Sequence, residues 1–211
     1  MMFHRRCGEG ITLINNSTTA VRNFCDFSER ERIFSAQPLQ NDELFEIRID
    51  KKVRAWTGAV EIGATTYDPE TLTDNQGQCW MLTATGILRN GHPLSDSMCD
   101  TNLDELEEGA TIGVMRTSND ELVFYINGIS QGVSATSIPA TVYAVVEIFS
   151  DCVQVSISRS SELRDEETID NDLAMGEASS ASLVANLNVN LNVNVNLPKN
   201  PTPAAIREDR L

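Results

Sequence analysis

Hydrophobic and polar residues alternate most regularly between Thr111 and Val133. Within this stretch, Leu122, Phe124 and Ile126 occupy alternate positions, so they share one face of a predicted strand. Asn127-Gly128 follows directly, and both residues tolerate the positive φ angles of a two-residue hairpin turn. The pattern predicts three short antiparallel strands in a row, joined by tight turns.

Similar alternation recurs along the first three-quarters of the chain, broken by turns rich in Gly, Asn and Pro. Further strands are predicted at residues 11–14, 19–22, 33–36, 44–53, 56–66, 80–88, 142–149 and 153–157, and a single helical turn at 103–106. This reading gives eleven or twelve strands and no long amphipathic helix. It predicts an all-β fold, an antiparallel β-sandwich of two packed sheets.

The composition changes after Ser160. The segment that follows has no aromatic residue and many acidic and small ones, so it cannot bury enough apolar surface to offset the entropy of ordering. From Asn186 to Leu197, Asn alternates with Leu or Val. Two interpretations stay open: a strand that adds to a sheet edge or self-associates, or low-complexity sequence in a disordered tail. We predict a folded domain over residues 1–160 and an acidic, mostly disordered tail over 161–211.

Charge and cysteine usage limit the classes of partner. Residues 1–160 carry 12 basic and 22 acidic side chains, a formal charge of −10, without a basic cluster that would neutralise nucleic-acid phosphates. The five cysteines form no CxxC pair, which argues against a zinc finger or a RING. No apolar run is long enough for a signal peptide or a membrane span. We expect reduced thiols, no transmembrane segment and a cytoplasmic location.

The residues that a catalytic site would need are scarce. The two histidines, His4 and His92, lie in terminal or turn-like segments, so a His-based triad has little support. Gly8-Glu9-Gly10 lacks the Lys-Ser/Thr of a phosphate loop. Three strand glutamates could form a carboxylate pair, although the pattern favours solvated positions on an outer face; they are Glu46, Glu61 and Glu147. We predict no catalytic residue, no metal site and no cofactor.

Large or cationic residues in or beside turns are the candidates for contact with a protein partner, because interface anchors are often aromatic or arginine. They are Arg48, Trp56, Tyr67, Trp80, Arg116, Tyr125 and Asn127. Tyr67 and Trp80 bracket a long loop, and Arg116 ends a strand next to a turn. Several have a competing structural role: packing for Trp56, Tyr67 and Trp80, a surface ion pair for Arg116, and the hairpin turn for Asn127. Arg48 alternates with the apolar face of its strand and points outward, where it could meet an acidic partner.

Six segments, taken in order, resemble the neuralized homology repeat. They are FHRRCG at 3–8, LFEIRID at 44–50, WTGAVEIGATT at 56–66, LDELEEGATIGVMR at 103–116, ELVFYINGISQGV at 121–133 and VYAVVEI at 142–148. WML at 80–82 and CVQVSIS at 152–158 are most similar to neuralized-like members with several repeats and no RING. The chain departs from the pattern in its shorter loop between Thr66 and Trp80, and in VVEIFS at 145–150.

This resemblance implies a concanavalin-like, SPRY-like sandwich that acts as a non-catalytic adaptor. Family members serve ubiquitin-ligase and centrosomal complexes, so the expected partner is a ubiquitin ligase or a centriolar protein, bound through loops at one end of the sandwich. Two alternatives remain open. One is an intracellular carbohydrate-binding module, and the other is the substrate-recognition part of an E3 ubiquitin ligase whose RING lies outside this chain.

Overall fold

The computed structural model describes residues 1–23, 30–53, 60–71, 77–94 and 102–158, all within one compact unit. These residues form thirteen antiparallel strands in two sheets and one short 3-10 helix, η1 (Leu103–Glu105), whose position matches the predicted helical turn. The antiparallel β-sandwich is therefore confirmed. Trp56, the segment from Asn186 to Leu197 and the predicted tail over 161–211 lie outside the described residues.

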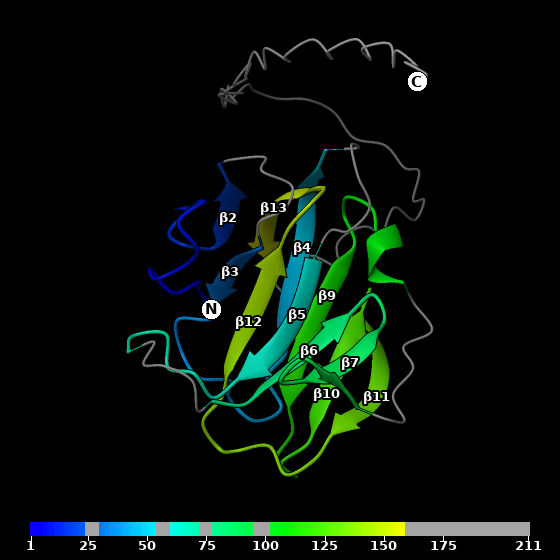
Figure 1. Ribbon diagram of the computed structural model, residues 1–211. Coiled ribbons are helices and arrows are strands. Elements are labelled where there is room, and N and C mark those ends of the chain that lie inside the picture. Colours follow the sequence, from blue (N-terminus) through cyan, green and yellow to red (C-terminus); the bar gives the residue numbers. More distant parts are fainter. Residues whose placement is uncertain (24–29, 54–59, 72–76, 95–101, 159–211) are drawn as a thin grey trace, which may run out of the picture. The chain divides into compact units, whose positions relative to one another are not determined.

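Two sheets pack face to face (Figure 1). In spatial order, the seven-stranded sheet contains β1 (Ile11–Ile14), β2 (Thr19–Arg22), β13 (Cys152–Ile157), β4 (Phe45–Lys52), β9 (Thr111–Arg116), β10 (Leu122–Ile126) and β11 (Ile129–Ala135). The six-stranded sheet contains β3 (Glu31–Phe34), β12 (Tyr143–Ile148), β5 (Val60–Thr65), β6 (Cys79–Thr83), β7 (Gly86–Arg89) and β8 (His92–Pro93). Many spatial neighbours are distant in the sequence, so the sheets bring together residues that the chain order keeps apart.

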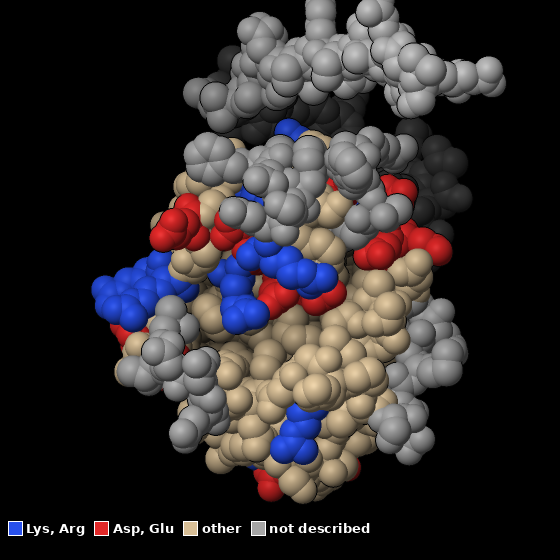
Figure 2. Space-filling model, in the orientation of Figure 1, with Lys and Arg blue, Asp and Glu red and all other residues tan. Residues whose placement is uncertain are grey.

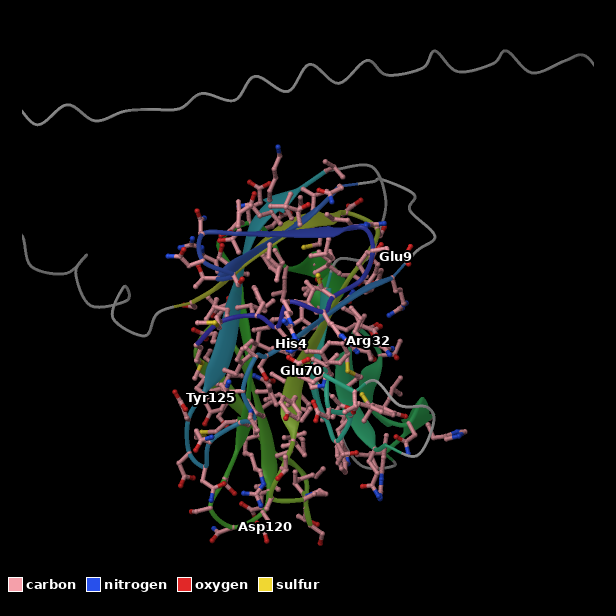
Figure 3. The ribbon with its side chains drawn as sticks, turned by 90° about the vertical axis from the view of Figure 1, so that its left-hand side faces the viewer. His4, Glu9, Arg32, Glu70, Asp120 and Tyr125 are labelled. Atoms are coloured by element: carbon pink, nitrogen blue, oxygen red, sulfur yellow. The ribbon has the colours of Figure 1, made fainter. Side chains whose placement is uncertain are left out.

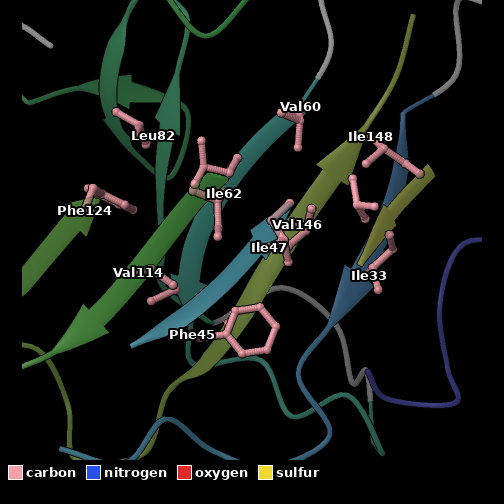
Figure 4. Packing of buried hydrophobic residues seen from close by; sticks show 14 of the residues in the cluster. Ile33, Phe45, Ile47, Val60, Ile62, Leu82, Val114, Phe124, Val146 and Ile148 are labelled. Carbon is pink, nitrogen blue, oxygen red and sulfur yellow. The ribbon is translucent and has the colours of Figure 1, made fainter. Parts of the chain in front are cut away.

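The core lies between the sheets and follows the predicted alternation. Ile47 and Val114 of the seven-stranded sheet join Ile62 and Val146 of the six-stranded sheet in one buried cluster (Figure 4). Each large aliphatic side chain buried in this way contributes about 1.5–3 kcal/mol. The hairpin between β10 and β11 also follows the sequence, since Asn127 and Gly128 adopt φ angles of 49° and 74°. Such a pair suits the right-handed twist of the two strands.

Two predicted strands have different limits in the structure. Residues 80–88, predicted as one strand, form two strands of a hairpin, β6 and β7, so that prediction is wrong. The turn lacks an Asn-Gly signal; instead, the Thr83 hydroxyl donates to the Gly86 carbonyl at 2.8 Å and accepts from the Thr85 backbone N–H at 3.3 Å. The strand predicted at 33–36 lies two residues earlier in the chain, at Glu31–Phe34.

The N-terminal segment protects the free edge of β3. The backbone N–H of His4 donates to the Phe34 carbonyl and that of Gly8 to the Arg32 carbonyl, both at 2.8 Å. Gly8 and Gly10 flank the buried Glu31 carboxylate, which accepts from the Gly10 N–H at 3.1 Å and occupies the space that a Cβ at either glycine would need. The Gly-x-Gly pair therefore encloses an internal carboxylate.

Candidate functional site: the outer groove of the six-stranded sheet

The six-stranded sheet carries ordered rows of side chains on the face turned away from the core. Every second residue of a strand points to this outer face, and cross-strand register places such residues side by side. Arg32, Glu147 and Glu61 form the first row, because Glu147 of β12 pairs directly with Arg32 of β3 and with Glu61 of β5. The row contains both signs of charge.

The second row is apolar. Val145 pairs with Phe34 on one side and with Gly63 on the other, and the row continues through Met81 to Leu88. A Cβ at Gly63 would collide with the Trp80 carbonyl and with the Met81 sulfur, 2.6 Å from that position. Gly63 thus allows β6 to approach closely and the Met81 side chain to lie over β5. Its pairings with Val145 and Met81 run in register, without a bulge.

A third row is polar and completes the site. Tyr143, Thr65 and Cys79 pair across β12, β5 and β6. Thr65 and Cys79 of this row line a hollow of about 490 Å³, together with Tyr67, which follows β5, and with side chains of the first two rows. We call this hollow the outer groove. Figure 2 shows this face, with acidic and basic side chains gathered beside the hollow.

Three charged side chains line the groove, Arg32, Glu61 and Glu147, and Arg30 forms hydrogen bonds with both glutamates. We call these four residues the charged quartet. Arg30 Nη1 donates to Glu61 Oε2 at 2.7 Å and to Glu147 Oε2 at 3.3 Å. Arg32 donates to Glu147 Oε1 through Nε and Nη2, at 2.9 and 2.5 Å. The Arg30 guanidinium also stacks on the Phe149 ring, 4.0 Å from its centroid.

The quartet exposes its cations and covers its anions. The side chains of Arg30 and Arg32 are 50% and 57% exposed, whereas those of Glu61 and Glu147 are 12% and 10% exposed. Burial raises the pKa of Glu61, and the hydrogen bond from Arg30 opposes that rise. A partner would therefore contact the exposed guanidinium groups, which the buried carboxylates hold in position by hydrogen bonds.

Burial also affects the pKa of Cys79, the thiol in the third row. It raises the pKa of Cys79 to about 11, so the group is a neutral thiol at physiological pH. Cys7, Cys79 and Cys152 are free cysteines in the structure. Cys79 therefore contributes a small, largely apolar surface to the groove.

Of the predicted contact residues, Tyr67 lines the outer groove. Trp80 lies on the opposite side of β6, in the core, where 2% of its surface is exposed, and Arg89 lies over its ring at 5.6 Å. Its neighbour Met81 faces the groove instead. The prediction of Trp80 as an exposed anchor is therefore wrong, because the alternation along β6 turns it inward.

Arg116 is also buried, although the sequence suggests a rim position. It is 3% exposed, and its guanidinium donates to the side chains of Asn41 and Asp120 and to the carbonyls of Ile138 and Pro139, at 3.1 and 2.9 Å. The prediction of a partner contact there is wrong, because the side chain is occupied in holding three segments together.

The other candidates belong to the seven-stranded sheet. Asn127 serves the hairpin turn as expected, since its side-chain oxygen accepts from the Thr111 N–H at 2.9 Å. Arg48 of β4 is exposed and forms an ion pair with Asp50 at 2.9 Å. Tyr125 of β10 is half-buried, and Figure 3 shows it on a different part of the molecule from Arg32. For Arg48 and Tyr125, partner contact stays a prediction.

The sequence reading missed the charged quartet. Glu61 and Glu147 do alternate with core residues as predicted, but they are not solvated, because Arg30 and Arg32 cover them. Glu46 is buried as well, which also contradicts the solvated position expected for it. One signal was available: Val145 and Val146 are adjacent apolar residues, and such a run marks a strand with apolar contacts on both faces.

A second polar cluster joins the N-terminal segment to the loop after β5. His4 is buried, and its Nε2 lies 3.0 Å from Glu70 Oε1, while its Nδ1 accepts from the Arg6 N–H at 3.1 Å. Because Nδ1 is an acceptor, Nε2 carries the proton and donates to Glu70. Arg5 donates to both Glu70 oxygens. The cluster fixes one end of the loop that carries Tyr67 (Figure 3).

Two kinds of feature are absent from the described residues. No group of three or more His, Cys, Asp or Glu side chains among them is arranged to hold a metal ion. Nor does that part of the chain contain a helix with the length and apolar character needed to cross a membrane.

The chain is similar in fold to solved neuralized domains. The Drosophila melanogaster neuralized NHR1 domain, in a crystal structure, is 22% identical, with a TM-score of 0.54 over 75% of this chain and 98% of that one. The solution structure of the Drosophila NEUZ (NHR) domain gives 19% identity and a TM-score of 0.55, covering 78% and 95% of the two chains.

A related sandwich extends the likeness beyond neuralized proteins. The SPRY domain of human HERC1 is 13% identical, with a TM-score of 0.51 over 72% of this chain and 93% of that chain. At these identities the likeness concerns the fold. The sequence profile of the Neuralized family matches residues 3–159, which include every strand of both sheets. The chain therefore belongs to the Neuralized family, whose domains mediate protein–protein interaction.

Proposed function

We propose that this protein is a non-catalytic adaptor that binds a segment of a partner protein in the outer groove. The observation that carries the proposal is the groove itself. It joins an apolar row to exposed guanidinium groups on a rigid sheet, and sites of mixed apolar and arginine character are typical of protein interfaces. The Neuralized family match supports the same function class.

The state of the two carboxylates supports binding over hydrolysis. A glycosidase needs one carboxyl as a proton donor and another free to act as base or nucleophile. Here both Glu61 and Glu147 accept hydrogen bonds from arginines, and Glu147 does so through both oxygens. An arginine pair of this kind holds a carboxylate as a structural acceptor.

We further propose that the adaptor works in the cytoplasm, in ubiquitin-ligase or centrosomal complexes, with a ubiquitin ligase or a centriolar protein as partner. The resemblance of the six segments to neuralized repeats supports this assignment, and three unpaired cysteines are consistent with a reducing compartment.

Proximity labelling in cells tests both proposals. The full chain serves as bait, compared with Leu88→Arg, which places a large cation over the apolar row, and with Ile14→Arg, an exposed change on β1 of the other sheet. We expect centrosomal or ubiquitin-ligase proteins labelled by the full chain and by Ile14→Arg to be lost with Leu88→Arg. Identical protein sets for all three baits would contradict a role for the groove.

A further inference from the structure

The spacing between the first two rows of the outer groove defines what kind of segment fits it. Glu147 and Val145 are two residues apart on β12, and their rows are therefore about 6.6 Å apart along the strand. An extended peptide has the same repeat, so its residues i and i+2 point to the same side at about the same separation. A peptide parallel to β12 places one side chain over each row.

The charged quartet favours an anion as its ligand. Arg30 donates through Nη1 alone and Arg32 through Nε and Nη2, so within the described residues Arg30 Nε and Nη2 and Arg32 Nη1 have no acceptor. Both side chains are at least half exposed. Those free donors are available to a ligand, and a planar guanidinium recognises a carboxylate through paired hydrogen bonds.

The charge balance of the quartet favours a ligand group that carries a single negative charge. Two arginines and two glutamates sum to zero, so the site lacks the excess positive charge that a doubly charged phosphate requires. A single carboxylate can use the outer donors while the inner carboxylates keep the guanidinium groups in place. The formal charge of −10 over residues 1–160 also disfavours a strongly acidic partner.

The apolar row supplies the second contact. Phe34, Val145, Met81 and Leu88 lie side by side across four strands, with no Cβ at Gly63 between them. Phe34, Met81 and Val145 form an apolar cluster of their own, separate from the core between the sheets. Phe34, Met81 and Val145 are themselves buried, so an aliphatic side chain placed over the row removes apolar surface from water mainly at the half-buried Leu88 and on the ligand itself.

From this geometry, and resting on the proposed function, we infer that the outer groove binds an extended partner segment in which a single Asp or Glu lies two positions from an aliphatic residue. The acidic side chain contacts Arg30 and Arg32, and the aliphatic one lies over the row from Phe34 to Leu88. Flanking residues of the segment are neutral or basic. Either chain direction satisfies the spacing.

Fluorescence anisotropy with designed peptides tests the inference on the full chain. The probe is Lys-Ser-Gly-Glu-Ser-Leu-Gly-Ser-Lys, and its matched controls replace Glu by Gln, move Glu next to Leu, or replace Glu by phosphoserine. We expect each control to bind at least tenfold more weakly than the probe, since the guanidinium contact to a charged group is lost, misplaced or mismatched. Equal binding of the probe and the Gln peptide, or tighter binding of the phosphoserine peptide, would overturn the inference.

Variants of the protein locate the contact. Arg32→Gln removes a guanidinium that is more than half exposed, and Lys51→Gln removes an exposed cation from β4 of the other sheet. We expect at least a tenfold loss of probe affinity with Arg32→Gln and none with Lys51→Gln. Thermal denaturation of both variants shows that they are folded. The peptide comparison uses the unmodified protein, so it holds even if Arg32→Gln fails to fold, and equal affinities of the two variants would overturn the location.

A photo-crosslinking amino acid at Tyr67 separates this inference from the proposed function. A partner protein crosslinked from Tyr67, but not from Lys51, through a segment without the acidic–x–aliphatic spacing would overturn the inference and leave the adaptor function standing. Crosslinking through a segment with that spacing supports both. If no partner reaches Tyr67, while the peptides still discriminate as expected, the inferred chemistry stands and the adaptor function fails.

Discussion

A buried guanidinium holds the turn between β9 and β10 to the segment that precedes β12. Arg116 contacts Asp120 in the turn, Asn41 before β4, and the carbonyls of Ile138 and Pro139. These contacts are directional and use three of its nitrogen atoms. A lysine has one nitrogen and cannot reproduce them.

We therefore predict that Arg116→Lys lowers the free energy of unfolding by about 2–3 kcal/mol, the range for losing hydrogen bonds to a charged group. The control is Arg48→Lys, whose exposed ion pair with Asp50 leads us to expect a change below about 1 kcal/mol. Urea denaturation monitored by tryptophan fluorescence measures both. Equal midpoints for the two variants would show that the buried contacts of Arg116 add little to stability.

Glu61 provides a prediction about pH. Burial raises its pKa in the folded protein, whereas the unfolded chain has the ordinary value of 4.5. The folded state therefore holds the proton to a higher pH, and the contribution of Glu61 to stability declines as pH rises from 4.5 through the raised pKa. We expect the stability of the wild type relative to Glu61→Gln to be greatest near pH 4.5 and smaller at pH 7.

Urea denaturation of both proteins at several pH values between 4.5 and 7 measures this difference, and other titrating groups cancel in the comparison. Glu9→Gln, at an exposed position, controls for the loss of a surface charge. A wild-type advantage that increases with pH would mean that the hydrogen bond and charge of Arg30 outweigh burial, and that the pKa of Glu61 is lowered.

At the scale of strands, the close approach of β5 and β6 depends on Gly63. A methyl group there would collide with the Trp80 carbonyl and the Met81 sulfur. We predict that Gly63→Ala costs about 1–3 kcal/mol through overpacking, and lowers Tm by roughly 3–10 °C. The control, Gly91→Ala, has open space around its Cβ position and bears only the strain of φ +78°, about 1–2 kcal/mol. A Gly63→Ala protein as stable as the wild type would contradict the overpacking.

The alternation of apolar and polar residues predicted most strands, because it depends only on residues that are consecutive in the sequence. Phe45, Ile47 and Ile49 are buried as expected, and Asn127-Gly128 forms its turn. The quartet could not be predicted in this way. Glu61 and Glu147 are neighbours only because β12 lies between β3 and β5, and this order depends on long-range pairing. Trp80 and Met81 are adjacent in β6, so one faces the core and the other the outer groove. Deciding which of them faces the groove needed the strand register as well.

At the scale of the whole molecule, charge opposes self-association. The chain has a formal charge of −15, of which the tail over 161–211 supplies −5, from 4 basic and 9 acidic residues. Repulsion of this kind extends over about 10 Å at 0.1 M salt and about 3 Å at 1 M salt. Any attraction between copies should therefore become measurable only when salt screens it.

The alternating segment from Asn186 to Leu197 is the feature that would supply such attraction, because strands with Asn on one face and Leu or Val on the other pair edge to edge in register. We predict that the mass of the full chain, measured by light scattering at 0.5 M NaCl, increases with protein concentration. A chain ending at residue 185 should remain monomeric. Replacing Val189, Leu191 and Val193 by Ser keeps the length and charge and should abolish the increase. If all three proteins scatter alike, the segment belongs to a disordered tail, and the adaptor acts through its folded domain alone.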